Sequence, residues 1–213
     1  MLENTTARFA DKTAIIMGER QVSFAQLEED SNRIAHALIR MGVEKGDRVA
    51  MIQGSNPEFV AVFFGIIKAG GIAVPLDSRY VTDELVSLFN DCRPRVLFIE
   101  NPPLESLLPA MPRFDSIKHI ITVNTEYDEQ FNSYRKILTN NPALGVNVAI
   151  SPEDIAIISY TGGPTLKPHG VALSHGSVYT ETVNSAETFQ QTEKDVVMQF
   201  ALPMYHQFGL TAV

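Results

Sequence analysis

The chain has 213 residues, of which 45% are hydrophobic and 20% charged, proportions typical of a folded globular protein. Its formal net charge is -8, and because its 17 basic residues form no stripe along the sequence, the charge argues against a nucleic-acid partner. The longest apolar run, residues 59–67, is too short to cross a bilayer and residues 1–11 do not resemble a signal peptide, so we expect a cytoplasmic protein without a membrane span.

The first element that the sequence predicts clearly is a helix over residues 23–41. Ser23 and Gln26 have the spacing of a capping box, in which each side chain satisfies a free N–H group at the start of the helix. Apolar residues then recur at helical spacing. Gly42 follows the last of them, at the position where a helix commonly ends.

Two short strands are expected next, over residues 47–52 and 72–76. Between them, Asn56 and Pro57 predict the start of a helix that extends to about residue 69. Because this helix is apolar on nearly every side, it should be buried.

A further helix is expected to begin at Thr82 as its N-cap, with an apolar face made by Leu85, Val86, Leu88 and Phe89. Later strands are predicted over residues 95–99, 119–123, 154–159, 171–174 and 196–202, with a last helix over 175–190. The proline-rich stretch over 102–112 has room for one short helix, and the weak pattern over 124–152 predicts one more over 131–138.

Strands and helices in alternation predict parallel strands joined by right-handed crossovers, with helices on both faces of the sheet. The fold class is therefore α/β. The single cysteine, Cys92, has no residues at metal-ligand spacing around it, so an ordinary thiol in a reducing compartment is expected.

The glycine- and proline-rich stretch that follows the strand over 154–159 is the candidate ligand site, because ligands of open α/β sheets usually bind beyond the carboxyl ends of the strands. Gly162 and Gly163 can turn the backbone so that its N–H groups face an anion. Thr165 adds a hydroxyl donor and Lys167 a positive charge. A phosphate cradle and an exposed glycine turn both fit this composition. The spacing excludes a Walker loop, and no G-x-G-x-x-G joins a strand to a helix.

Four segments together resemble the AMP-forming adenylating enzymes, a family of acyl- and aryl-CoA synthetases, firefly-type luciferases and peptide-synthetase adenylation domains. Residues 160–175, YTGGPTLKPHGVALSH, are similar to the family's phosphate-loop signature Y-T-S-G-T-T-G-x-P-K-G-V-x-L-T-H. The other three segments are VSFAQLEEDSNRIAHAL, GDRVAMIQGSNPEFVAVFFGIIKAGGIAVPLD and LPMYHQFGL. The resemblance covers essentially the whole chain, in the family's order.

By this resemblance, residues 1–213 form part of an N-terminal AMP-binding domain, without the rest of that domain and without the small C-terminal domain. The full-length enzyme would use ATP and Mg²⁺ to convert a carboxylic acid, first of all a fatty acid, into an acyl-adenylate, from which CoA would displace AMP. The expected partners are the acid, ATP and CoA. The catalytic residues and the acidic Mg²⁺ ligand are expected beyond residue 213, so the chain alone should be inactive.

The resemblance also assigns individual residues. The β- and γ-phosphates of ATP would be held by Thr161, Gly162, Gly163, Pro164, Thr165, Leu166 and Lys167. By the resemblance His206 would border the acyl and CoA channel, whereas the sequence alone favours a histidine that caps or stacks locally. Pro203, His206 and Gly209 resemble the acyl- and aryl-CoA ligases, whereas peptide-synthetase domains usually carry a Phe-Asp pair in this segment.

The phosphate loop departs from the family's signature at several positions. Pro164 stands where the family has threonine, which removes a backbone donor and a hydroxyl. Leu166 stands in place of a glycine and Gly162 in place of a serine. His169 replaces a lysine, so a permanent charge is lost. These changes predict weak triphosphate binding, and they favour a second hypothesis: a degenerate, non-catalytic ligase that keeps an acyl or nucleotide pocket. A third is an acyl–AMP ligase or a luciferase-like enzyme.

Overall fold

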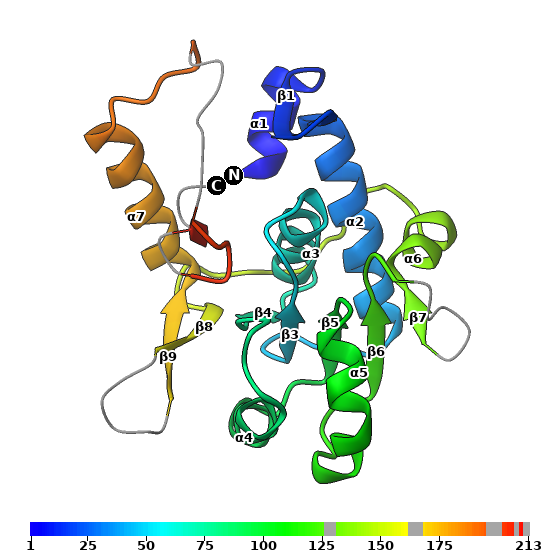
Figure 1. Ribbon diagram of the computed structural model, residues 1–213. Coiled ribbons are helices and arrows are strands. Elements are labelled where there is room, and N and C mark those ends of the chain that lie inside the picture. Colours follow the sequence, from blue (N-terminus) through cyan, green and yellow to red (C-terminus); the bar gives the residue numbers. More distant parts are fainter. Residues whose placement is uncertain (126–130, 162–167, 195–201, 207–208, 211–213) are drawn as a thin grey trace.

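The computed structural model describes residues 1–125, 131–161, 168–194, 202–206 and 209–210, and the structural statements below refer to these residues (Figure 1). Its helices are α1 (Leu2–Phe9), α2 (Phe24–Arg40), α3 (Pro57–Lys68), α4 (Thr82–Cys92), α5 (Pro103–Leu107), α6 (Tyr134–Asn140) and α7 (His175–Thr188), with a 3-10 helix η1 (Leu108–Arg113). Its strands are β1 (Thr13–Met17), β2 (Arg20–Ser23), β3 (Arg48–Ile52), β4 (Ile72–Pro75), β5 (Val96–Ile99), β6 (His119–Thr122), β7 (Asn132–Ser133), β8 (Ile155–Thr161) and β9 (His169–Ser174).

Most of these strands form one 7-stranded sheet in the order β7-β6-β5-β3-β4-β8-β9, and β1 and β2 form a separate hairpin. All neighbours in the large sheet are parallel except β8 and β9, which are antiparallel. The predicted α/β class is confirmed, and the antiparallel pair β8–β9 is an exception to the general expectation of parallel strands. A connection confined to residues 162–168 is too short for a parallel crossover, so the chain forms a hairpin.

The sheet separates two hydrophobic cores, because helices cover both of its faces. Helices α2, α3 and α6 pack on one face, while α4, α5 and η1 pack on the other. Strand β3 shows the alternation most plainly: Val49 and Met51 point into the first core, and Ala50 and Ile52 into the second, all at 0% exposure. This central parallel strand is therefore buried on both faces, as is typical of parallel sheets.

Local signals placed the helix starts of α2 and α3 correctly. Ser23 Oγ accepts a hydrogen bond from the N–H of Gln26 at 3.2 Å, and Gln26 Oε1 accepts one from the N–H of Ser23 at 2.9 Å. Asn56 Oδ1 accepts from the N–H of Phe59 at 2.8 Å, directly before the proline that begins α3. Both caps are therefore confirmed, and Gly42 ends α2 with φ of +78°.

The predicted cap of α4 is wrong. The residue before the helix is Val81, in an extended conformation, and its N–H is satisfied by Glu84 Oε2 at 3.0 Å. Thr82 is already helical, and its hydroxyl donates instead to the carbonyl of Ser106 at 3.1 Å, a tertiary contact that no local pattern reveals. The predicted apolar face of this helix is confirmed, since all four of its residues are buried.

Other differences concern the ends of the chain and the loops. Neither α1 nor the β1–β2 hairpin was predicted from the sequence. The proline-rich stretch forms η1 as well as the expected short helix. Strand β8 is buried only at Ala156 and Ile157. Its whole length pairs with the edge strand β9, but its register with β4 is confined to Ile157. The strand predicted over 196–202 lies almost wholly outside the described residues.

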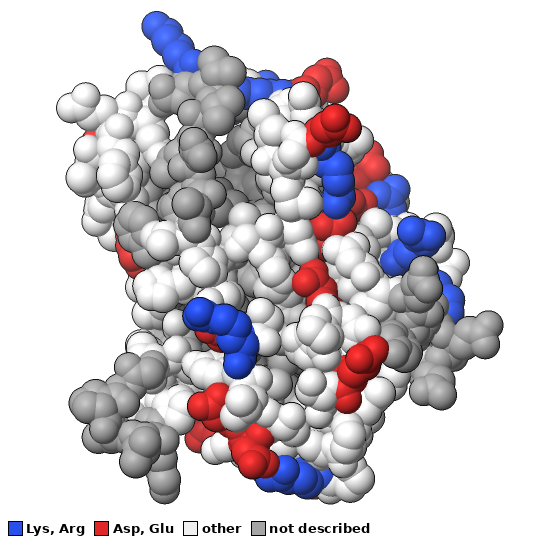
Figure 2. All heavy atoms as spheres, in the orientation of Figure 1, with Lys and Arg blue, Asp and Glu red and all other residues white. Residues whose placement is uncertain are grey.

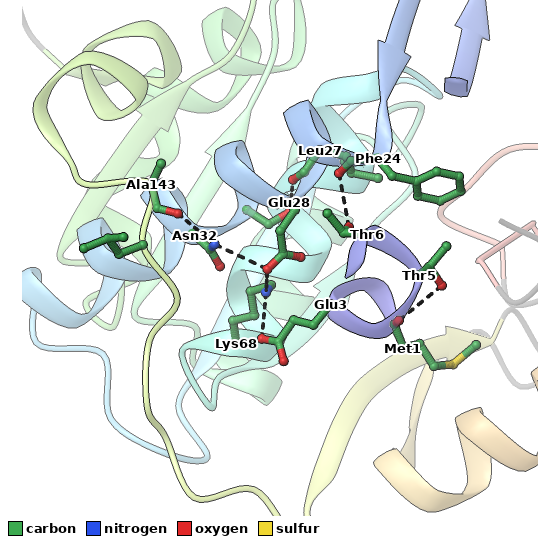
Figure 3. Close-up of polar contacts among 12 residues, drawn as sticks. Met1, Glu3, Thr5, Thr6, Phe24, Leu27, Glu28, Asn32, Lys68 and Ala143 are labelled. Carbon is green, nitrogen blue, oxygen red and sulfur yellow. Dashed lines mark hydrogen bonds and ion pairs between the residues drawn. The ribbon is translucent and has the colours of Figure 1, made fainter. Parts of the chain in front are cut away.

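A polar cluster joins α1 to the helical layer (Figure 3). Lys68 Nζ, at the end of α3, lies 2.6 Å from Glu28 Oε1 on α2 and 3.0 Å from Glu3 Oε1 on α1. Asn32 Nδ2 donates to the carbonyl of Ala143 at 2.9 Å, so the segment before β8 is attached to the same cluster. These contacts hold three helices and one loop together at one side of the sheet.

Within the described part of the chain, no helix is both long and apolar enough to cross a membrane. On the face shown in Figure 2, acidic and basic side chains are interspersed, and neither sign gathers into a patch.

Candidate functional site

The carboxyl ends of the parallel strands lie at one edge of the sheet, where ligands of α/β proteins usually bind. Strand β4 lies on one side of β3 and β5 on the other, so the order of the strands reverses between β3 and β5. In open α/β sheets, such a reversal of strand order is the usual place for a ligand.

A side chain of the protein itself joins the two strand ends at this point. Glu100 follows β5, and its Oε2 accepts a hydrogen bond from the N–H of Gly54 at 3.0 Å, after the end of β3. Its Oε1 accepts from Nδ2 of Asn56 at 2.6 Å, the residue that caps α3. The carboxylate thus uses the donors that an anionic ligand would need at this point. The chemistry is therefore expected farther along the edge, at β4 and β8.

The stem of the predicted phosphate loop lies at that part of the edge. Thr161 ends β8, and its register partner across the hairpin is His169, the first residue of β9. The hairpin therefore brings the two ends of the loop together. Gly162, Gly163, Pro164, Thr165, Leu166 and Lys167, predicted to bind phosphate, lie outside the described residues, so their assignment stays a prediction.

Gly170 is required by the packing of this stem. A Cβ at position 170 would lie 2.9 Å from Cγ2 of Ile158 and 3.2 Å from Cζ of Tyr160. The glycine that follows His169 therefore lets the two strands of the hairpin carry bulky side chains on one face. The sequence predicted a glycine-rich loop here but not this packing.

Tyr160 attaches the stem to the second core. Its hydroxyl donates to Oδ2 of Asp91, near the end of α4. Burial, together with this hydrogen bond, raises the pKa of Tyr160 well above its ordinary value, so the phenol stays protonated. The neighbouring Cys92 is buried, and burial raises the pKa of its thiol to about 11, although the hydrogen bond with Tyr160 acts in the opposite direction.

We expect Cys92 to react slowly with Ellman's reagent. With a thiol pKa of about 11, only about 0.1% is thiolate at pH 8, against about a quarter for an ordinary cysteine, so the rate should be about 200-fold below that of a free thiol. Because Cys92 is the single cysteine of the chain, the absorbance change reports on it alone. The same reaction in 6 M urea should be fast. A rate in the native chain that rises with a midpoint near pH 8.5 would contradict this environment.

The neighbouring strand β4 ends in a cluster of three polar side chains that the sequence did not single out. Asp77 accepts hydrogen bonds from Arg79 Nε at 3.1 Å and from Arg79 Nη2 at 2.7 Å. Nη2 also donates to the hydroxyl of Tyr205 at 2.9 Å. Although burial acts to raise it, the hydrogen bonds from Arg79 hold the pKa of Asp77 below its ordinary value. The position of Asp77 directly after a buried strand was the only signal in the sequence.

The segment over 202–206 lies at the same edge. The N–H of Met204 donates to Oγ of Ser55 at 3.0 Å, and the side chain of Met204 packs against the first core. His206, predicted to border the acyl and CoA channel, is exposed, and its N–H donates to the carbonyl of Pro203 at 3.0 Å. Tyr205 thus links this segment to the end of β4, while Thr161 ends β8, the strand next to β4 in the sheet.

Among the residues that the structure describes, no group of three or more His, Cys, Asp or Glu side chains is arranged to hold a metal ion.

Comparisons with known proteins agree with this arrangement. A family model described as AMP-binding enzyme matches residues 2–213. A medium/long-chain-fatty-acid–CoA/3-oxocholest-4-en-26-oate–CoA ligase of Mycobacterium marinum is 34% identical over 188 residues, which cover 84% of this chain and 34% of the relative. An indoleacetate–CoA ligase of Aromatoleum aromaticum is 32% identical over 201 residues, which cover 93% of this chain and 39% of that protein.

A solved structure of similar shape is that of the anthranilate CoA ligase AuaEII in complex with anthranoyl-AMP. It matches with a TM-score of 0.82 and 28% identity, over 86% of this chain and 35% of that one. The chain thus spans about a third of the length of the ligases it matches.

Proposed function

Because the chain belongs to the AMP-binding enzyme family, we propose that residues 1–213 are part of the N-terminal domain of an ATP-dependent, AMP-forming carboxylic acid–CoA ligase. The observation that carries this proposal is the juxtaposition at the carboxyl edge of the sheet. There, the stem of the phosphate-loop sequence closes at Thr161 and His169, and the segment with His206 lies at the neighbouring strand end. The phosphate-loop sequence resembles the signature of the whole family, and the segment with His206 resembles that of the acyl- and aryl-CoA ligases.

The reaction that this edge would serve begins with the attack of a substrate carboxylate on the α-phosphorus of ATP. It gives an acyl-adenylate and pyrophosphate, and CoA then displaces AMP. The phosphate-loop residues would hold the β- and γ-phosphates, with Thr165 as hydroxyl donor and Lys167 as point charge, so that donors are in place where negative charge accumulates. His206 would border the acyl and CoA channel. The described residues provide no ligand set for Mg²⁺, so no residue is assigned to it.

For the substrate, we propose a fatty acid first, since the Mycobacterium marinum relative is named for its action on medium- and long-chain fatty acids. The solved anthranilate ligase holds an aromatic acyl-adenylate, so an aryl acid is the alternative within the same chemistry. ATP, CoA and the acid are the proposed partners, and the cytoplasm is the proposed location. A degenerate, non-catalytic ligase is the second candidate, and the substitutions in the phosphate loop favour it.

The proposal is tested by joining the chain to the part of a related ligase that the chain does not cover. The 213-residue chain alone should show no carboxylate-dependent ATP–pyrophosphate exchange, because the other two thirds of the ligases it matches are not included. Joined to the aligned remainder of the Mycobacterium marinum ligase, it should catalyse exchange with a fatty acid and release acyl-CoA.

The matched control joins the relative's own first third to the same remainder through the same junction. If this control is active while our joined chain stays inactive, with its phosphate loop either native or restored to the family's signature, the ligase proposal fails. Exchange by the 213-residue chain alone would equally contradict the expectation.

A further inference from the structure

The segment over 202–206 is held in place by contacts with two strand ends and a helix. Tyr205 accepts a hydrogen bond from Arg79, which follows β4. Met204 is bonded through its N–H to Ser55, between β3 and α3. Met204 and Leu210 also pack on α3, where they enclose a cavity of only about 30 Å³ together with Phe59, Val60, Phe63 and Phe64. The apolar contacts hold the segment against α3, and the two hydrogen bonds hold it along the edge of the sheet.

Hydrogen bonds to Asp77 orient the guanidinium of Arg79 toward Tyr205. Asp77 Oδ1 accepts from the backbone N–H of Arg79 at 2.9 Å and from its Nε at 3.1 Å, while Oδ2 accepts from Nη2 at 2.7 Å. The Asp77 carboxylate therefore binds the planar guanidinium through two nitrogens (the clamp), and Nη2 also donates to the hydroxyl of Tyr205 at 2.9 Å. A lysine has no such planar group, so it cannot reproduce this clamp.

We propose that Arg79, oriented by Asp77, is a positioning residue that holds Tyr205 through their hydrogen bond (the latch) and thereby sets the position of the adjacent His206 at the end of β4. The latch itself stands on the contacts above. Its functional consequence rests on the proposed function, in which His206 borders the acyl and CoA channel.

Because Arg79 is exposed, its role in positioning Tyr205 can be distinguished by experiment from a role in the stability of the fold. The side chain of Arg79 is 80% exposed, and exposed ion pairs contribute little to the stability of a protein. Loss of the latch should therefore leave the free energy of unfolding nearly unchanged, yet increase the local opening of the segment over 202–206. A residue that merely supports the fold would change both or neither.

Amide hydrogen exchange of the 213-residue chain, followed by mass spectrometry, tests the latch. Tyr205→Phe and Arg79→Met should each speed exchange in peptides over 202–206 by about threefold or more, with no further gain in the double variant, because both break one contact. Ser55→Ala removes the independent contact to Met204, so its effect should add to that of Tyr205→Phe. Unchanged exchange in Tyr205→Phe, or additive effects of Arg79→Met and Tyr205→Phe, would overturn the proposal.

The phenol of Tyr205 provides a spectroscopic check. Burial and the nearby Asp77 raise its pKa above the ordinary value, so Asp77→Asn should lower the midpoint of the Tyr205 ¹³Cζ titration. An unchanged midpoint of the Tyr205 titration in Asp77→Asn would contradict the placement of Asp77 and Arg79 beside Tyr205.

In the joined enzyme, which is this chain followed by the remainder of the Mycobacterium marinum ligase, Tyr205→Phe should raise KM for the acid and for CoA. KM for ATP should stay unchanged. An equal rise for ATP would count against a role at His206. If the joined enzyme is inactive, the proposed function fails, while hydrogen exchange still decides whether the latch exists.

Discussion

Replacement of Gly65 by alanine is expected to lower the free energy of unfolding by about 2 kcal/mol, which corresponds to a fall in Tm of about 4–8 °C. At this residue, α3 packs against α2 with no room for a side chain. A Cβ at position 65 would lie 2.5 Å from Cγ2 of Ile34, 2.6 Å from its Cβ and 3.0 Å from the carbonyl oxygen of Ser31. Overpacking costs about 3 kcal/mol, and the better helix propensity of alanine offsets about 1 kcal/mol of it.

Urea denaturation at pH 7 measures this change, and two further variants control it. Gly145→Ala adds a methyl group where no atom lies within 4 Å, so its effect should stay below about 0.5 kcal/mol. In a chain that already carries Ile34→Ala, Gly65→Ala should cost less, because much of the obstructing side chain has been removed. A Gly65→Ala chain as stable as its parent would mean that the two helices do not approach as the structure shows.

The second large effect concerns the phosphate loop. Combined restoration of the family's residues, by Gly162→Ser, Pro164→Thr, Leu166→Gly and His169→Lys, should tighten the binding of Mg²⁺-ATP and of tripolyphosphate at least tenfold, or about 1.4 kcal/mol. The restored chain regains a backbone N–H, two hydroxyls and a cation, and hydrogen bonds to charged groups contribute about 1.5–3 kcal/mol each. Lysine at position 169 is sterically feasible, because His169 is exposed in β9.

Thermal-shift titration measures this gain, since a ligand that binds only the native chain raises its Tm. The parent chain should show little or no rise with either ligand, and the restored chain a saturating one. Thr165→Ala in the restored chain is the control: it removes the proposed hydroxyl donor without changing the charge, and should cancel part of the gain. A parent chain that already binds Mg²⁺-ATP as tightly as the restored chain would refute the weakening attributed to the loop. If the chain joined to the remainder of the Mycobacterium marinum ligase is active only after the four loop residues are restored, the result would favour the degenerate-ligase hypothesis.

Features that depend on a few neighbouring residues could be predicted from the sequence. Ser23 and Gln26 indicated the start of α2, and Asn56 with the following proline indicated α3, because a cap is made within one turn of the helix. The apolar periodicity of α2 and α4 and the apolar runs of β3 and β4 indicated an α/β protein. The family signature around Thr161 pointed to the edge of the sheet where the structure places that residue.

Contacts between distant residues required the folded structure. Arg79 and Tyr205 are separated by 126 positions, and Tyr160 and Asp91 by 69, so no pattern within one element indicates either contact. The antiparallel pairing of β8 and β9 followed from the short connection between them rather than from the alternation of the elements. Glu100 accepts hydrogen bonds from Gly54 and Asn56 because β3 and β5 end side by side, a condition that exists only once the sheet has formed.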